Sequence, residues 1–274
     1  MNIHHITNNG SDLGIVMPVD RMDSLFTKSC IAHIEQSKGV SYDLVVVESC
    51  GEEFYYGKSV NAGIKELNGC EYIVLIDNDA TIDENALRTI THYMDSHEQV
   101  GLCSGWEYKE SRLNTVGYVH MGGSLDYFSM ALRERAPFFA MRRFNMRNNY
   151  SYGVKGVKKY KPRKMCAIGG AFCCFGRECL EDIGLLDEDY RSTFVDIDFS
   201  FEVMLSPRWY LSTCPAKFWH IGGSTKPPYR EFHRALDAAK TYLDKWPKER
   251  IAQVLKAAKR GKFLIPDQDR WKVK

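Results

Sequence analysis

Short apolar runs alternate with helical patterns through the first hundred residues of the chain. Residues 13–19 (LGIVMPV) and 42–49 (YDLVVVES) are rich in β-branched residues, which is typical of buried strands. Apolar residues between them recur at helical spacing. Further along, the pattern predicts a helix over about 57–67, a strand leading into 72–79, a helix over 83–99 and a strand over 100–105. This alternation predicts a parallel sheet with helices on both faces.

The pattern changes after residue 105. Residues 106–164 carry turn residues and cations without clear periodicity, so we expect a long loop or insertion there. Order returns with a strand-like segment over 166–176, a short helix over 177–184 and a carboxylate-rich turn that leads into another helix. The end of the chain is helical in pattern and is interrupted by Pro247.

These segments predict one domain over residues 1–225, with a basic insertion at about 133–164, and a helical extension and tail over 226–274. With 274 residues and 44% hydrophobic content, the chain can bury a sizeable core. No stretch approaches the roughly 20 apolar residues that span a bilayer, and the first residues lack the pattern of a signal peptide. Nine cysteines without repeated spacing indicate reduced thiols. We therefore expect a cytoplasmic protein.

The net charge of +2 conceals a strong asymmetry. Residues 133–164 contain eleven Lys or Arg and one acidic residue, so this segment carries +10, and the remaining 26 basic and 34 acidic residues carry −8. Aromatic residues are interleaved with these cations, a combination that suits phosphates and bases. A solvated basic loop has the same composition, and both interpretations stay open. The candidate residues for binding a polyanionic acceptor are Arg142, Arg143, Lys158 and Lys159.

Two aspartates, Asp77 and Asp79, follow the predicted strand that begins at residue 72. If the strand continued, both side chains would project to the same side. Two like charges at this distance repel unless a cation lies between them, and Mg²⁺ or Mn²⁺ takes carboxylate oxygens. An acidic loop without a metal has the same spacing, so spacing alone does not decide. Ligands of parallel sheets bind at the carboxyl ends of the strands, where Pro18, Glu48 and the two aspartates fall.

Six stretches of the chain together resemble nucleotide-sugar-dependent glycosyltransferases of the GT-A fold, most closely the inverting family 2. In order they are GIVMPV, VVVES, NAGIKELNGCEYIVLIDNDATI, GGAFCCFGRECLEDIGLLDEDY, VDIDFSFEV and HIGGS, within about residues 13–224. The resemblance implies a Rossmann-like α/β fold with a mostly parallel central sheet flanked by helices. It also implies a hexosyl- or pentosyltransferase that moves a sugar from a nucleotide-diphosphate donor to an acceptor hydroxyl, with inversion.

The resemblance assigns roles to matching residues. Asp77 and Asp79 match the D-x-D motif that holds Mn²⁺ or Mg²⁺ against the donor diphosphate, and His220 matches a histidine that completes the metal shell in some members. Asp196 matches the general base that deprotonates the acceptor, although Val195 stands where the family has glutamate; Asp198 is the nearby carboxylate expected to support it. The expected donor-binding residues are Pro18, Val19, Glu48, Asn61, Asp77, Asn78, Asp79, Gly169 and Gly170.

Plainer interpretations stay open for several of these residues. His220 also fits a structural histidine, and Asp196 fits an acidic helix N-terminus that is stabilised by the helix dipole. The glycine pair at 169–170 fits either a close approach of the backbone to the sugar or a β-bulge. Glu48 stands where the family has an aspartate that binds the nucleobase, which leaves the base open.

The acceptor also stays open at this stage. The basic segment favours a polyanion, for example hydroxymethylated DNA glycosylated by a phage-type enzyme in the host cytoplasm. The alternative is a glycosyltransferase of surface polysaccharide or lipopolysaccharide, with its basic C-terminal helix in peripheral contact with an anionic membrane. Two other classes share some of these features: a nucleotidyltransferase, and a non-catalytic sugar- or nucleic-acid-binding relic.

Overall fold

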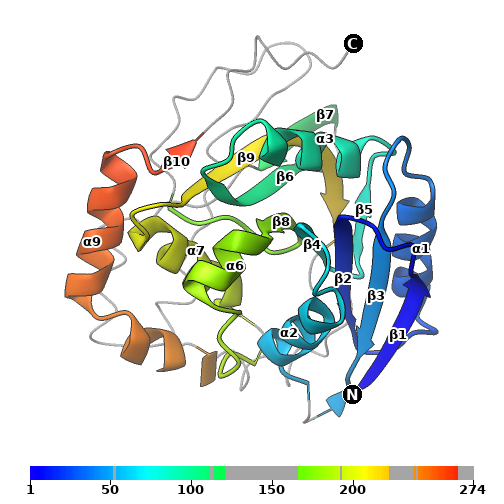
Figure 1. Ribbon diagram of the computed structural model, residues 1–274, viewed down its shortest axis with the longest axis horizontal. Helices are drawn as coiled ribbons and strands as arrows, with labels where there is room; N and C mark the ends of the chain where they lie inside the picture. The colour runs from blue at the N-terminus through cyan, green and yellow to red at the C-terminus, as the bar shows by residue number, and fades with distance from the viewer. Residues whose placement is uncertain are drawn as a thin grey trace.

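The computed structural model describes residues 1–51, 54–111, 114–120, 166–191, 193–221, 237–238 and 240–264. Ten strands within these ranges form one sheet in the order β1-β3-β2-β4-β8-β6-β9-β10, with β5 beside β9 and β7 beside β6 (Figure 1). The strands are β1 (Asn2–Thr7), β2 (Leu13–Val19), β3 (Asp43–Glu48), β4 (Tyr72–Ile76), β5 (Ala80–Ile82), β6 (Val100–Ser111), β7 (Asn114–His120), β8 (Phe172–Gly176), β9 (Tyr210–His220) and β10 (Phe263–Leu264). The helices are α1 (Leu25–Glu35), α2 (Tyr56–Glu66), α3 (Ala86–Asp95), α6 (Arg177–Ile183), α7 (Val195–Leu205) and α9 (Lys248–Lys259).

The sheet is mixed, which corrects the prediction of a mostly parallel one. Strands β3, β2 and β4 are parallel, as are β6, β9 and β10. Strand β1 runs antiparallel to β3, and β8 runs antiparallel to both β4 and β6. The cause for β8 is its point of entry: the Asp77 N–H donates to the Ala171 carbonyl at 3.0 Å. The chain thus enters β8 at the carboxyl end of β4 and has to run back along it.

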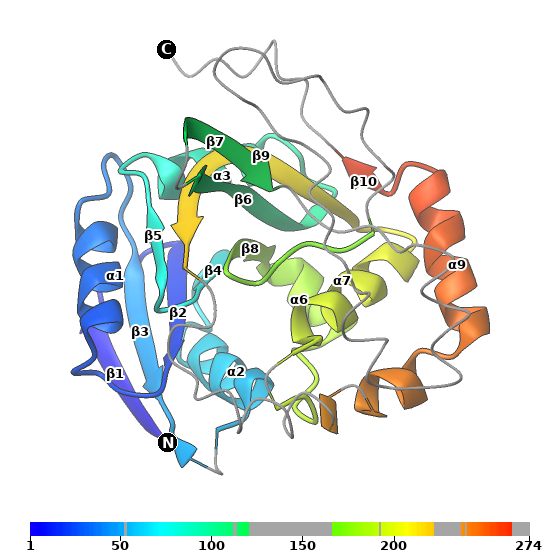
Figure 2. The same ribbon diagram turned by 180° about the vertical axis from the view of Figure 1, so that it is seen from behind.

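Helices cover both faces of the sheet, as the sequence predicts (Figure 1 and Figure 2). Neighbouring residues of β2 show the division, because side chains alternate between faces along a strand. Val16 belongs to a core shared with α2, α7 and α9, whereas Ile15 and Met17 belong to a core shared with α1 and α3. The two cores hold the sheet between helical layers and keep the carboxyl ends of β2, β3 and β4 at one edge.

The expectation of a loop from residue 106 is wrong for its first part. Strand β6 continues to Ser111 and returns as β7, and residue 106 pairs with Lys217 of β9. The sequence pattern missed β1 and β9 as well. These strands lie near the edges of the sheet or mix polar and apolar residues, so they lack the continuous apolar run that marks β2 and β4.

The C-terminal segment is part of the same packed structure. Residues 240–245 are helical, α9 buries Ile251 and Val254 in the core that includes α7, and β10 pairs with β9. The apolar face of α9 is therefore covered by the protein, and the expected contact of its basic residues with an anionic membrane stays a prediction. Among the described residues, no helix is long and apolar enough to cross a membrane. The predicted boundary at residue 225 stays a prediction.

Candidate active site

The first group of the site is built by a tight turn and a strand pairing. The Ala80 N–H donates to the Asp77 carbonyl at 3.0 Å, so the chain turns after β4 and does not continue as a strand. Strand β5 then pairs antiparallel with β9, with Ala80 opposite His220. This register brings the imidazole to the aspartates: His220 Nε2 lies 3.1 Å from Asp79 Oδ1 and 3.8 Å from Asp77 Oδ2.

The donor atoms of Asp77, Asp79 and His220 fit a divalent cation. One ligand atom from each residue lies within 4.8 Å of the other two. Mn²⁺ accepts carboxylate oxygen and imidazole nitrogen together, whereas Mg²⁺ prefers oxygen ligands and several waters.

His220 carries a proton more readily than an ordinary histidine. Burial acts to lower its pKa, but the hydrogen bond to Asp79 and the charges of Asp77, Asp79 and Glu107 outweigh burial and raise the pKa. Glu107 Oε1 lies 3.8 Å from Nδ1, on the other side of the ring. Because a metal-bound histidine has to be neutral at the ligating nitrogen, a cation that binds here has to displace this proton, and its binding weakens as pH falls.

Tyr56, at the start of α2, was not expected from the sequence. Its hydroxyl donates to Asp77 Oδ1 at 2.6 Å, and its N–H donates to the Arg191 carbonyl at 3.0 Å. Burial, followed by the charge of Asp77 and with a further contribution from Asp196, raises the pKa of Tyr56 well above its usual value. The phenol therefore stays protonated and acts as a donor. No motif marks this position, because its role depends on how α2 packs on the sheet over β2 and β3.

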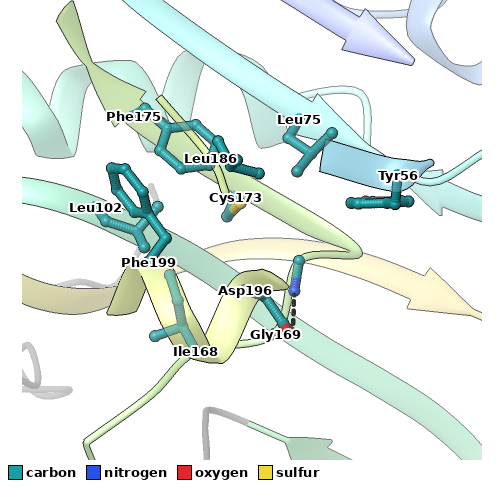
Figure 3. A pocket seen from close by; sticks show the side chains of 11 residues that line it. Tyr56, Leu75, Leu102, Ile168, Gly169, Cys173, Phe175, Leu186, Asp196 and Phe199 are labelled. Carbon is teal, nitrogen blue, oxygen red and sulfur yellow. Dashed lines mark hydrogen bonds between the residues drawn. The ribbon is translucent and has the colours of Figure 1, made fainter. Parts of the chain in front are cut away.

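Asp196 lies in the first turn of α7, at a small pocket (Figure 3). Its carboxylate accepts hydrogen bonds from the Gly170 N–H at 3.1 Å and from the Ile197 N–H at 2.9 Å. Burial raises the pKa of Asp196 to about 6; the two N–H groups oppose this shift, and Asp77 adds to it. Other side chains that line the pocket are Tyr56, Leu75, Leu102, Ile168, Phe175 and Phe199.

The glycine pair lies in a turn before β8. A Cβ at Gly170 would lie 3.3 Å from the Cβ of Asp196, closer than most such contacts. Gly170 thus lets the backbone N–H approach the carboxylate, and a side chain at this position would push the two apart. This is a close backbone approach to Asp196; the expected approach of Gly169 and Gly170 to the sugar stays a prediction.

Asp198 is not among the residues that line this pocket, and its expected support of Asp196 stays a prediction. Residues two apart on an α-helix are separated by about 200° around the axis. The Asp198 side chain is 2% exposed and accepts hydrogen bonds from Trp246 Nε1 at 2.7 Å, Lys245 Nζ at 2.8 Å and Tyr190 OH at 3.2 Å. It joins α7 to the C-terminal segment.

Two expected donor-binding asparagines also make contacts elsewhere. The Asn61 amide is buried; it donates to the Leu186 carbonyl at 2.8 Å and accepts from the Leu186 N–H at 3.1 Å. It fastens α2 to the loop before α7. The Asn78 amide donates to Thr27 Oγ1 of α1 at 3.1 Å. Both residues support the carboxyl edge of the sheet without pointing at the aspartate cluster.

The remaining expected residues end the parallel strands. Pro18 and Val19 end β2 and are buried, and Glu48 ends β3. The Glu48 carboxylate accepts from the Met22 N–H at 3.0 Å and contacts His4 Nε2 at 3.2 Å. The Met22 N–H, followed by other hydrogen bonds, lowers the pKa of Glu48. The nucleobase contact of Glu48 stays a prediction, and Arg142, Arg143, Lys158 and Lys159 lie outside the described residues.

Comparison with known proteins places this geometry in a family. Residues 14–226 match the model of the family described as glycosyltransferase like family 2. A search of curated proteins gives no match.

Solved structures give weak matches. The S. aureus TarS 1–349 structure is 13% identical, covering 89% of this chain and 78% of that one, with a TM-score of 0.48. TarS 1–349 in complex with UDP is 14% identical, covering 84% of this chain and 65% of that one, also with a TM-score of 0.48. The mannosyltransferase PcManGT from Pyrobaculum calidifontis, in complex with GDP-Man and Mn²⁺, is 12% identical. The match covers 90% of this chain and 74% of that one, with a TM-score of 0.43.

Proposed function

Because the chain belongs to the family 2-like glycosyltransferases, we propose that it transfers a sugar from a nucleotide-diphosphate donor to an acceptor hydroxyl in one metal-dependent, inverting step. One observation carries the proposal. Tyr56 donates to Asp77 of the aspartate–histidine cluster and lines the same pocket as Asp196. Tyr56 thus lies beside both the candidate metal site and the candidate base, and Asp77 is close enough to raise the pKa of Asp196. This proximity suits attack of an acceptor hydroxyl on a nucleotide-sugar donor.

Asp77, Asp79 and His220 would hold the cation, which when bound supplies positive charge to the diphosphate that leaves. Tyr56 holds one oxygen of Asp77 and leaves Oδ2 facing His220. Asp79 is 8% exposed, and its backbone carbonyl accepts the Ile221 N–H at 3.2 Å. The three ligands are therefore held on a turn and a strand end that are fixed by backbone hydrogen bonds.

Asp196 would take the proton from the acceptor hydroxyl. A pKa of about 6 leaves the carboxylate ionised at neutral pH and makes it a stronger base than an ordinary aspartate. The Gly170 and Ile197 N–H groups fix the orientation of the carboxylate. Inversion is inferred from the family resemblance and from the need for a base on the acceptor side in a single displacement.

The acceptor we favour is a polyanion such as modified DNA, because residues 133–164 carry a charge of +10 and the rest of the chain carries −8. A surface polysaccharide is the alternative. Filter binding of duplex DNA at low and moderate salt separates these. Binding that weakens steeply with salt supports the polyanion, and no binding at low salt removes it.

A thermal-shift panel tests the donor half of the proposal. UDP-glucose, UDP-N-acetylglucosamine and GDP-mannose are each added with and without Mn²⁺. We expect one of them to raise the melting temperature only when the metal is present, because a ligand that binds only the folded state stabilises it. The same donor should release nucleoside diphosphate when Mn²⁺ is supplied. If no donor shifts the melting temperature or is turned over with Mn²⁺, the proposed function is wrong.

A further inference from the structure

The C-terminal segment contacts the first turn of α7 on the side opposite the pocket. Three of its residues make the contact, Tyr242, Lys245 and Trp246, and we call them the C-terminal clamp. Trp246 is fully buried and packs edge-to-face on Phe201 of α7, with ring centroids 5.0 Å apart. The clamp therefore lies against the helix that carries Asp196.

The strongest contact of the clamp is with Asp198. Trp246 Nε1 donates to Oδ1 at 2.7 Å, and Lys245 Nζ donates to Oδ2 at 2.8 Å. Lys245 Nζ also lies 2.8 Å from Asp187 Oδ2, so it ties the loop before α7 to the helix. Charge-assisted hydrogen bonds of this length are about twice as strong as neutral ones and strongly directional. They fix the rotation of the first turn of α7 about its axis.

The second contact holds a strained residue. Phe194, directly before α7, has φ 71°, and it is the single non-glycine residue with positive φ in the described part of the chain. This conformation is unfavourable for a bulky side chain and persists only where the surroundings enforce it. The Phe194 ring stacks on Tyr242 with centroids 4.8 Å apart and an interplanar angle of 18°. The clamp thus restrains the chain two residues before Asp196 and two residues after it.

We propose that Lys245 and Trp246 are positioning residues for catalysis: through Asp198 they set the rotation of α7 that keeps the Asp196 carboxylate at the Gly170 N–H, beside the pocket. The inference rests on the proposed role of Asp196 as the base. Because Asp196 and Asp198 share one helical turn, a rotation that releases Asp198 also moves Asp196 away from the Gly170 N–H. A displacement of the base lowers the chemical rate more than it changes donor binding.

The test compares substitutions in the clamp with a substitution that only loosens the same segment. Lys245→Met removes the ammonium group, Trp246→Phe removes the indole N–H but keeps an aromatic ring, and Lys245→Arg is the conservative variant. Val254→Ala is the matched control, since Val254 is buried in α9 and no hydrogen bond to Asp198 depends on it. Each variant is measured with the nucleotide sugar found in the thermal-shift panel and with Mn²⁺.

We expect Lys245→Met and Trp246→Phe to lower kcat about tenfold, with KM for the donor changed less than about twofold. Lys245→Arg should recover most of the rate. Val254→Ala should lower the melting temperature but leave kcat near that of the parent. Hydrogen exchange of a peptide covering residues 195–200 should be faster in Lys245→Met than in Val254→Ala.

Equal changes of kcat in the clamp variants and in Val254→Ala would overturn the inference, because the clamp would then act only on stability. Should Lys245→Met fail to fold, Trp246→Phe decides alone. Asp196→Asn is measured alongside. If it stays active, Asp196 is not the base and the positioning role fails with it; if it is inactive while the clamp variants keep full kcat, only the positioning role has failed. The proposed function itself fails only if the parent turns over no donor.

Discussion

The chain contains two aspartate pairs with the same spacing and opposite outcomes. Asp77 and Asp79 lie in a turn between β4 and β5, and both approach His220. Asp196 and Asp198 lie in the first turn of α7 and face opposite sides. One faces the pocket, and the other is bound by the C-terminal segment. The element that carries a D-x-D spacing thus decides whether its carboxylates converge.

The two pairs also differ in how their charges are compensated. Asp198 has an ammonium, an indole and a phenol as donors, which is typical of a structural ion pair. The carboxylates of Asp77 and Asp79 face a histidine with a raised pKa, and Asp196 has only backbone N–H donors in the contacts described above. A carboxylate whose pKa is shifted by burial and by a nearby charge, as that of Asp196 is, is a candidate for catalysis.

The largest effect is expected from Asp196→Asn. This variant should lose about 10²-fold or more in kcat, the usual scale for removal of a general base, while Kd for the donor with Mn²⁺ stays near that of the parent. Steady-state kinetics and donor titrations measure the two quantities. In the parent, activity should fall as pH falls through about 6, because protonated Asp196 cannot accept the acceptor's proton.

A product that retains the anomeric configuration of the donor would contradict the role of Asp196, since a single displacement inverts it. Proton NMR of the product distinguishes the two anomers. An Asp196→Asn variant with nearly full turnover would remove the comparison altogether, because neither member of the helical pair would then be catalytic.

The next largest effect concerns the turn pair. Asp79→Asn should weaken Mn²⁺ binding by about 10- to 100-fold, because it removes one of three ligands and the hydrogen-bond acceptor of His220. Calorimetric titration with Mn²⁺ alone measures this without turnover. Asp83→Asn is a matched control at the other end of β5, outside the cluster. Equal Mn²⁺ affinity in parent and Asp79→Asn would place the metal elsewhere.

Much of the fold could be predicted from local pattern. The continuous apolar runs of β2 and β4, and the helices between them, need no long-range information. Strands β1 and β9 could not be found in this way, because they are defined by their partners: Ile3 faces Val47, and Lys217 of β9 lies beside residue 106. The antiparallel direction of β8 depends on the end of β4 at which the chain enters the sheet, and the hydrophobic pattern of the sequence does not contain this information.

The site was predictable where a motif names a residue and unpredictable where packing chooses it. Asp77, Asp79, His220 and Asp196 were named from the resemblance, and the structure brings the first three together. Tyr56 was missed because nothing in its neighbourhood marks a hydroxyl that reaches Asp77. The partners of Asp198 are not predictable from its spacing, because the spacing does not show which segment packs against that side of α7.

The smallest effect concerns the two aspartates of α7. Replacement by asparagine should lower the stability of the protein at Asp198 and raise it at Asp196. At pH 7.5, Asp198→Asn should lower the free energy of unfolding by about 2 kcal/mol, because it weakens charge-assisted bonds to Trp246 and Lys245. Asp196→Asn should raise the melting temperature by a few degrees. Differential scanning calorimetry measures both variants beside the parent.

The sign for Asp196 follows from its pKa. The folded protein keeps this proton up to pH about 6, whereas the unfolded chain releases it near 3.8, so folding binds protons in this window. The stability that Asp196 contributes is present below pH 3.8 and is lost as pH rises through about 6, which lowers the free energy of unfolding by at most about 3 kcal/mol.

Asparagine has no charge to bury, so Asp196→Asn avoids this loss of stability. The gain is smaller than the loss it avoids, because an amide oxygen accepts the Gly170 and Ile197 N–H groups more weakly than a carboxylate does. The advantage of Asp196→Asn should therefore shrink as pH falls from 7.5 to 4. A melting temperature that drops in both variants at pH 7.5 would mean that Asp196 is a structural carboxylate like its neighbour.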